Sequence, residues 1–313
     1  MTTSRKFSTQ RGFTLMELMV AMAITTIIVT VLVSITSIAM DTWNRSRAEL
    51  RASRQAKAMV DMMVRDFEAL VIRRGNTYEW LSAISTSTLP GDKLKSTNAA
   101  ELIFFSASTD RYDGEIGINN KKDKGGDVSC VGYRLNYKDP IDQNGNLFKT
   151  FVLNRMLVNP DKTFKDLLGK PDLTAAFANY SLKLNEVDNF LCENVYQFTV
   201  TFHVEATKQA SGSGAGSATI INVPVTVGQT SAGQVTKSLK IKGSGIDAQI
   251  SANNVTPDEL KAGRITAMEV SLTVLSDFAV DQLRNRPFTE SQKSQFLAKN
   301  SYQFSKLVQI PSM

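Results

Sequence analysis

The strongest pattern in the chain is a long apolar segment near its N-terminus. No Asp, Glu, Lys or Arg occurs from Leu18 to Met40, where valine, isoleucine, methionine, leucine and alanine dominate. At about 1.5 Å per residue, a helix over this range is long enough to cross a hydrocarbon core of about 30 Å. The pattern therefore predicts a membrane-spanning helix, which we assign to residues 13–40.

The helical pattern continues beyond the apolar segment. From Asp41 to Gly75 the chain contains no proline. Apolar residues recur there at steps of three and four, which is typical of one face of an amphipathic helix: Ala56, Met59, Val60, Met63, Phe67, Leu70 and Val71. Arg73 and Arg74 suit a helix C-terminus and Gly75 suits its cap. We predict one continuous helix from Thr14 to Arg74, whose second part, within residues 41–75, enters a globular domain.

After Gly75 the period of the apolar positions changes to two, which indicates β-strands. The predicted strands cover residues 100–108, 130–137, 147–158, 194–204, 217–227, 238–245 and 265–277. Thr289 and Gln292 have the spacing of a capping box for a short helix to Asn300, and residues 304–310 return as a strand. The expected fold class is α+β, with the long helix covering one face of a mostly antiparallel sheet in a β-rich domain, residues 76–313.

Composition and charge exclude several classes of protein. The chain is 42% hydrophobic and 21% charged, which is ordinary for a folded protein. Its net charge of +6 is diffuse, and Arg5, Lys6 and Arg11 supply part of it at the N-terminus. No dense basic stripe with interleaved aromatic residues is present, so we expect no binding to nucleic acid.

The residues that most often ligate metals or catalyse reactions are scarce. Cys130 and Cys192 are the only cysteines and His203 is the only histidine, so we expect no structural zinc site, no catalytic triad, no cofactor and no enzymatic activity. The two cysteines form either one disulfide in an oxidising compartment or two buried free thiols.

One acidic segment raises the question of a calcium site. The segment around Asp142, Asn144 and Gly145 fails as an EF-hand loop, because Pro140 and Phe151 fall where carboxylates are required. A looser calcium site with Asp110, Asp113 and Glu115 is the alternative to a solvated loop. Of these two, we expect the solvated loop. The segment at 142–147 is predicted to form a hairpin turn centred on Asn144 and Gly145.

The segment before the apolar run differs from a secretory signal peptide. A signal peptide has a small-residue cleavage site after its apolar core, whereas here Gly12 precedes the core and follows a short basic stretch. This order suggests a leader, residues 1–12, that is removed while the helix stays. The sequence from Gly12 to Leu18, GFTLMEL, resembles the processing motif of type IV pilins and type II secretion pseudopilins. The resemblance implies that a prepilin peptidase cleaves after Gly12 and methylates the new amino group of Phe13.

Glu17 is an acid at the edge of the apolar segment. An ionised carboxylate there is costly unless it is paired, so intramembrane acids are functional candidates by default. The ammonium group released on Phe13 would be a suitable partner, in the same chain or in a neighbouring one. The resemblance makes Glu17 the assembly glutamate; the alternative is a carboxylate solvated among lipid headgroups.

Segments of the globular part resemble the J-type minor pseudopilins of type II secretion and the related W-type minor pilins. The matching segments, in order, are MMVRDFEALVIRR, ELIFFS, VGYRLNY, ENVYQFTVTF and AMEVSLTVL. Lys149 stands near the place where an arginine often follows the hairpin leucine, and loops at about 156–190 and 206–245 depart from the family pattern.

The resemblance implies a large minor subunit near the tip of a periplasmic filament that helps to start assembly for protein export. Its partners would be other major and minor pseudopilins through the N-terminal helix, the prepilin peptidase, the inner-membrane assembly platform, and membrane lipid before assembly. The chain would be a single-pass protein of the bacterial inner membrane with its globular domain in the periplasm. Two alternatives stay open: a minor pilin of a type IV pilus or DNA-uptake pseudopilus, and an anchored binding domain that never polymerises.

Overall fold

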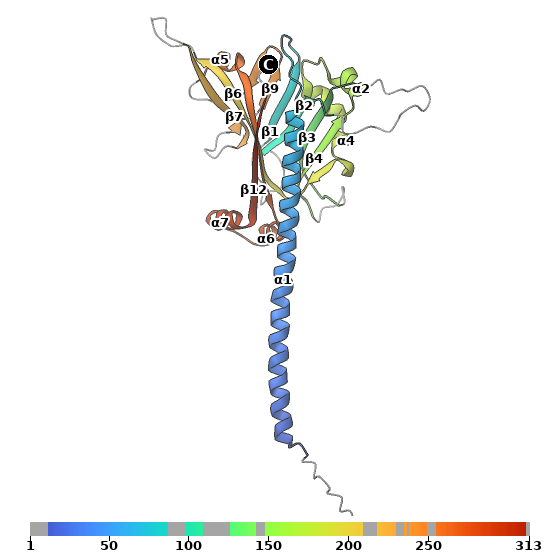
Figure 1. Cartoon of the computed structure of the whole chain (residues 1–313), viewed down its shortest axis with the longest axis vertical. Coiled ribbons are helices and arrows are strands. Elements are labelled where there is room, and N and C mark those ends of the chain that lie inside the picture. Colours follow the sequence, from blue (N-terminus) through green and yellow to red (C-terminus); the bar gives the residue numbers. More distant parts are fainter. Residues whose placement is uncertain are drawn as a thin grey trace, which may run out of the picture. The chain divides into compact units, whose positions relative to one another are not determined.

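The computed structural model describes residues 12–86, 98–108, 126–141, 148–208, 218–229, 235–236, 238–248 and 255–310. The chain divides into two compact units, one up to Ala48 and one from Glu49 onward. Helix α1 (Leu15–Glu68) supplies the described secondary structure of the first unit and continues into the second (Figure 1). It contains a stretch that is long and apolar enough to cross a membrane, none of it buried within the protein.

Helix α1 ends at Glu68, six positions before the predicted end at Arg74. Beyond it, Leu70 forms an isolated bridge with Ser106, and the backbone N–H of Val71 donates to the carbonyl oxygen of Phe105 at 2.9 Å. The prediction was wrong here because the backbone leaves the helix to pair with the end of a strand. Leu70 and Val71 continued the apolar period because they pack on the core, which the extended chain also allows.

The second unit contains two sheets in which all described pairings are antiparallel. The first sheet has seven strands in the order β10-β9-β1-β2-β3-β4-β5. Their bounds are β1 (Glu79–Thr86), β2 (Asn98–Ser106), β3 (Ser129–Lys138), β4 (Thr150–Val158), β5 (Phe190–Cys192), β9 (Ser238–Lys242) and β10 (Gly245–Ala248). The second sheet has the order β12-β11-β6-β7-β8. Its strands are β6 (Val195–Lys208), β7 (Thr219–Gln229), β8 (Val235–Thr236), β11 (Arg264–Leu275) and β12 (Ser301–Gln309).

These sheets confirm the α+β fold class and each of the predicted strands, with small shifts at their ends. Strands β3 and β4 pair from Cys130 and Val158 to Lys138 and Thr150, as expected for a hairpin. The predicted turn at Asn144 and Gly145 lies outside the described residues. Strand β6 buries Phe198, Val200, Phe202 and Val204, the face that its alternation predicts.

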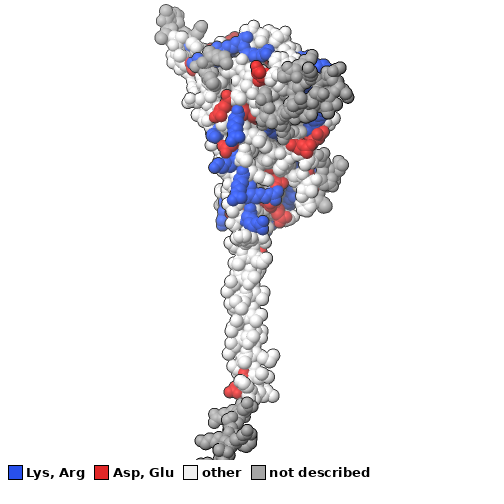
Figure 2. Space-filling model, turned by 45° about the vertical axis from the view of Figure 1, so that its right-hand side comes forward, with Lys and Arg blue, Asp and Glu red and all other residues white. Residues whose placement is uncertain are grey.

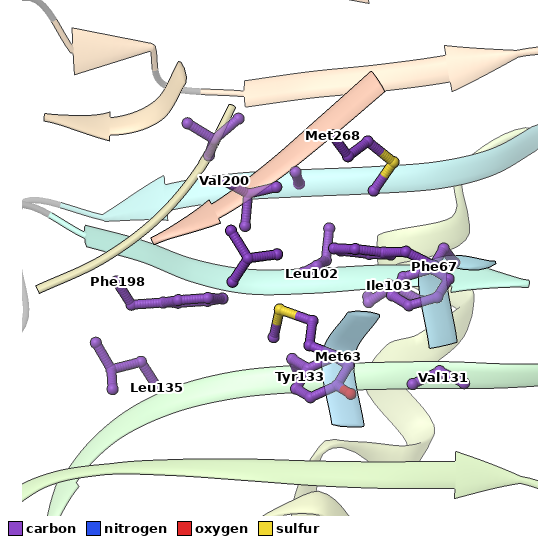
Figure 3. Close-up of a cluster of buried hydrophobic side chains, with 14 of the residues drawn as sticks. Met63, Phe67, Leu102, Ile103, Val131, Tyr133, Leu135, Phe198, Val200 and Met268 are labelled. Atoms are coloured by element: carbon purple, nitrogen blue, oxygen red, sulfur yellow. The ribbon is translucent and has the colours of Figure 1, made fainter. Parts of the chain in front are cut away.

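The part of α1 that belongs to the second unit, residues 49–68, packs with the second sheet on one face of the first sheet. The ring of Phe67 on α1 lies 5.0 Å from that of Phe104 on β2, between ring centroids. Figure 3 shows Met63 and Phe67 of α1 with Leu102, Tyr133 and Phe198 in one cluster of side chains. The hydrophobic core therefore joins three elements that are far apart in sequence.

The opposite face of the first sheet is covered as well, which corrects the prediction of strands with a single buried face. Residues 160–189 form a chain of short helices: α2 (Pro160–Lys162), η1 (Thr163–Leu167), α3 (Leu173–Phe177), η2 (Ala178–Tyr180), α4 (Ser181–Leu184) and η3 (Val187–Asn189). Phe177 of α3 lies against Gly132 of β3, and a β-carbon on this glycine would come within 2.4 Å of the ring. Thr174 shares a hydrogen bond with Ser82 of β1. We expected this segment to be a long loop.

The last helices and strand complete the second unit. Helix α5 (Pro257–Lys261) precedes β11, and α6 (Asp277–Asn285) and α7 (Glu290–Asn300) connect β11 to β12. The predicted capping box is present at α7, where Thr289 and Gln292 exchange hydrogen bonds. The returning strand β12 pairs with β11 from Ala267 and Gln309 to Leu275 and Ser301.

Candidate functional site: the N-terminal processing and assembly segment

Gly12 and Phe13 lie in an exposed, non-helical segment before α1. The side chain of Phe13 is 89% exposed, and a β-carbon built on Gly12 would meet no atom within 4 Å. The peptide bond between them is therefore accessible to an enzyme without unfolding of the helix. The rest of the predicted leader, residues 1–11, lies outside the described residues.

Glu17 closes a capping box at the first turn of α1. Its Oε2 accepts hydrogen bonds from the backbone N–H of Thr14 at 3.0 Å and from the Thr14 hydroxyl at 2.9 Å. The backbone N–H of Glu17 donates to the Thr14 hydroxyl at 3.2 Å. The two residues thus satisfy N–H groups that the start of a helix leaves without partners. An acid in the first turn is also favoured by the helix dipole.

The capping box changes the interpretation of Glu17. The sequence suggested only a partner amine or solvating headgroups, yet the Thr-x-x-Glu spacing that signals a capping box was present at Thr14 and Glu17. In the structure, the carboxylate is anchored through Oε2 to Thr14, the residue next to Phe13. No described residue donates a hydrogen bond to Oε1, so this second oxygen is available to another donor.

Apart from Glu17, most polar side chains of the first part of α1 form hydrogen bonds within the helix. The hydroxyls of Thr25, Thr26, Thr30, Ser34 and Thr36 each donate to the carbonyl oxygen four residues earlier, at 2.8–3.0 Å. Such bonds let hydroxyl groups lie in an apolar medium. Figure 2 shows this part of the helix as an uncharged surface with an acidic patch near its start. Glu17 is the only charged residue from Gly12 to Met40.

Cys130 and Cys192 are both buried, and both are free thiols. Cys130 on β3 pairs with Val158 of β4, whereas Cys192 on β5 pairs with Leu153 on the other side of β4. At about 3.3 Å per residue, Leu153 and Val158 are roughly 16 Å apart, while the Cα atoms of a disulfide lie within about 7 Å. Of the two alternatives from the sequence, the geometry therefore excludes the disulfide in this fold.

No group of three or more His, Cys, Asp or Glu side chains that could hold a metal ion occurs in the described part of the chain. Asp110, Asp113 and Glu115, the alternative calcium ligands, lie outside that part. His203 is in β6, opposite Ala267 of β11 and Pro224 of β7.

Comparisons with known proteins bear on the N-terminal segment. A family model described as the prokaryotic N-terminal methylation motif matches residues 7–33, which include Gly12, Phe13 and Glu17. Among curated proteins, no sequence matches the chain. Among solved structures, a type IV-like pilin from Thermus thermophilus is similar at 10% sequence identity, with a TM-score of 0.29, over 83% of this chain and 97% of that one.

The matched motif begins in the predicted leader and ends inside α1, so it spans the exposed Gly12–Phe13 bond and the capping box. The sequence prediction of a prepilin-like N-terminus agrees with it. The chain therefore carries the N-terminal methylation motif at the head of a long apolar helix, and an antiparallel β-rich unit follows it.

Proposed function

We propose that the chain is a minor pseudopilin, a structural and non-enzymatic subunit of a type II secretion pseudopilus near the filament tip, where it helps to start assembly for protein export. The observation that carries the proposal is the arrangement of Gly12, Phe13 and Glu17: an exposed cleavage bond beside a carboxylate that is fixed at the start of α1.

In this proposal, a prepilin peptidase cuts the Gly12–Phe13 bond and methylates the amino group released on Phe13. The new ammonium would lie next to Thr14, whose N–H already contacts Glu17. An ammonium and a carboxylate in an apolar medium attract each other strongly because little water screens them. The pair would form within one chain or between neighbouring helices, and in either case it removes the cost of a lone charge at the membrane edge.

The type II assignment rests on the resemblance of the globular segments to J-type minor pseudopilins. Those segments supply the end of α1 and strands β2, β3, β6 and β11, which share one buried cluster: Met63, Phe67, Leu102, Tyr133, Phe198 and Met268. The proposal includes a single-pass inner-membrane location with residues 13–40 in the bilayer and the domain in the periplasm. Its partners are major and minor pseudopilins, the assembly platform and, before assembly, lipid.

Mass spectrometry of the N-terminal peptide tests the processing step directly. We expect the mature chain from its native host to begin at N-methylated Phe13. As a control, a bulky residue at the cleavage position, Gly12→Leu, should leave the leader attached. A mature chain that retains Met1, or one cut beyond Met40, would contradict the proposal.

Two substitutions separate the charge of Glu17 from its capping role. Glu17→Gln retains an oxygen that can complete the capping box but removes the charge. Thr14→Ala removes the cap, at a cost of about 1 kcal/mol, and retains the charge. We expect Glu17→Gln to lower the amount of the chain in purified filaments about tenfold, equivalent to ~1.4 kcal/mol, and Thr14→Ala to lower it less than threefold.

If the unmodified chain is itself absent from purified filaments and both variants keep its function, the chain is an anchored domain that does not polymerise. If Thr14→Ala alone fails, Glu17 acts only as a cap. Deletion of the gene then identifies the machine: loss of protein secretion supports a pseudopilus, whereas loss of twitching motility or of transformation indicates a type IV pilus or an uptake pseudopilus.

A further inference from the structure

We propose that a basic cleft in the unit from Glu49 onward binds an extended acidic segment of a partner protein. The cleft lies where the ends of the two sheets meet, next to the segment that follows α1. The inference goes beyond the filament proposal and is tested without it, because it concerns residues of the globular unit alone.

The cleft has a volume of about 1140 Å³. Residues 72–74, the β9–β10 turn, the start of β11 and the end of β12 all contribute to its lining. Pockets for small ligands usually measure about 300–1,000 Å³. This cleft exceeds that range, so it has room for several residues of a polypeptide.

Positive side chains dominate the lining. Arg73, Arg74, Lys242, Lys261 and Arg264 contribute to it, whereas Glu205 is the only acid among the described residues of the lining. Glu205 is already engaged, because its Oε2 lies 3.1 Å from Nη2 of Arg264. Within the described part of the chain, no acidic side chain pairs with Arg73, Arg74 or Lys261. These three cations therefore favour an anionic ligand.

The cleft also has apolar surface and an unused hydrogen-bond donor. Ile241, Ile246 and Ile310 are 3–5% exposed, and Trp80 is 4% exposed, so they lie deep in the lining. The indole Nε1 of Trp80 is buried and has no hydrogen-bond partner among the described residues. An indole N–H can only donate, so its complement is an acceptor such as a peptide carbonyl. Together these features suit a strand in which acidic and apolar side chains alternate.

Two glycines in the lining lie in close contact with neighbouring segments, one with a backbone atom and one with a side chain. Gly245 has φ +138°, and a β-carbon there would lie 2.2 Å from the carbonyl oxygen of Lys261. A β-carbon on Gly263 would lie 2.7 Å from Cγ1 of Val204. Because glycine lets these segments touch, the cleft exists before any ligand binds. Binding therefore requires no free energy to open it.

The test follows Trp80 fluorescence in the full chain, held in a non-ionic detergent. The chain contains two tryptophans, so Trp43→Phe leaves Trp80 as the reporter. The probe is an end-blocked nine-residue peptide of alternating Glu and Val, and the same peptide with Gln in place of Glu serves as its neutral control. We expect a saturable change with the acidic peptide, and binding at least tenfold weaker with the neutral one.

Charge reversal locates the binding. The triple variant Arg73→Glu, Arg74→Glu, Lys261→Glu should weaken acidic-peptide binding at least tenfold. A triple variant with the same charge change at exposed residues away from the cleft, Lys165→Glu, Lys183→Glu, Lys299→Glu, should change it less than twofold. Circular dichroism verifies that both variants stay folded; if the cleft variant unfolds, Lys261→Glu alone should still weaken binding at least threefold.

Several results would overturn the proposal: no saturable change up to about 1 mM peptide, equal binding of the neutral peptide, or equal weakening by the two triple variants. Inorganic phosphate that displaces the peptide at equal concentration would also overturn it, because the cleft would then be a site for small anions.

Discussion

At the scale of single residues, the most informative group is a buried charge cluster between α1 and the first sheet. Asp66 of α1 is 2% exposed and Arg155 of β4 is 4% exposed. Arg155 donates from Nε to Oδ2 of Asp66 at 2.8 Å and from Nη2 to Oδ1 at 2.7 Å. The hydroxyl of Tyr133 donates to the same carboxylate. Burial, and then the charge of Asp66, raises the pKa of Tyr133 well above its usual value, so this hydroxyl stays protonated as a donor.

The cluster predicts a large difference between two acids of the same helix. Asp66→Asn leaves the buried Arg155 without a counter-charge, which should lower the free energy of unfolding by about 3–5 kcal/mol. Asp61→Asn removes only an exposed ion pair with Lys306, which is worth at most about 1 kcal/mol. Urea unfolding of the full chain in detergent measures both.

A control tests whether charge is the cause. Asp66→Leu combined with Arg155→Met removes both partners and should recover most of the loss, because no charge is left buried. Equal destabilisation by Asp66→Asn and Asp61→Asn would show that the cluster is unimportant. The apolar period of this helix does not distinguish Asp66 from the other acids of the helix.

At the scale of elements, sequence patterns predicted the long helix and the strands whose apolar and polar residues alternate. They missed strand β1 and the short helices between β4 and β5, each for a physical reason. Strand β1 was missed because two of its buried positions are polar, Glu79 at its start and Ser82 within it. There its carboxylate accepts from the N–H of Leu173 at 2.8 Å and lies 3.4 Å from Nζ of Lys240. These partners come from distant segments, so a local pattern cannot reveal them.

The short helices between β4 and β5 were missed for a different reason. They are three to five residues long, too short to establish a helical period. They form because they cover the first sheet, where Phe177 and Leu173 are fully buried. In the N-terminal segment, by contrast, the proposed roles of Gly12, Phe13 and Glu17 depend on local spacing, so this candidate site could be predicted from the sequence alone.

At the scale of the whole molecule, the strand order could not be predicted, since it depends on contacts across the chain. Strands β9 and β10 return to the first sheet beside β1 after the chain has formed most of the second sheet. That order also separates the two cysteines, which lie on opposite sides of β4. Burial raises the pKa of Cys130, and burial together with the charge of Glu193 raises that of Cys192 to about 12.

A thiol titration tests this placement. With Ellman's reagent at pH 8, we expect no reaction in the folded protein and two thiols after unfolding in urea without reductant. Fast labelling of the folded protein would contradict the buried placement, and no thiols after unfolding would reveal a disulfide.

The raised pKa values also predict how stability depends on pH. In the unfolded chain the thiols lose their protons above their ordinary pKa of 9.0, whereas in the folded state they stay protonated. The free energy of unfolding should therefore fall as the pH rises from about 9 towards 12. The loss should be about 1 kcal/mol per thiol at pH 10, and Cys192→Ala should reduce it.

The way α1 ends has a mechanical consequence. After Glu68, the N–H of Val71 binds the carbonyl of Phe105, and the N–H of Ala107 binds the carbonyl of Ala69. The helix therefore continues directly into an antiparallel pairing with β2, while Asp66 binds β4. Tension along residues 49–68 of α1 would load these hydrogen bonds and the packed side chains at the same time, as shear. The bonds would then not break one after another. The attachment should therefore yield at a higher force than one that peels apart.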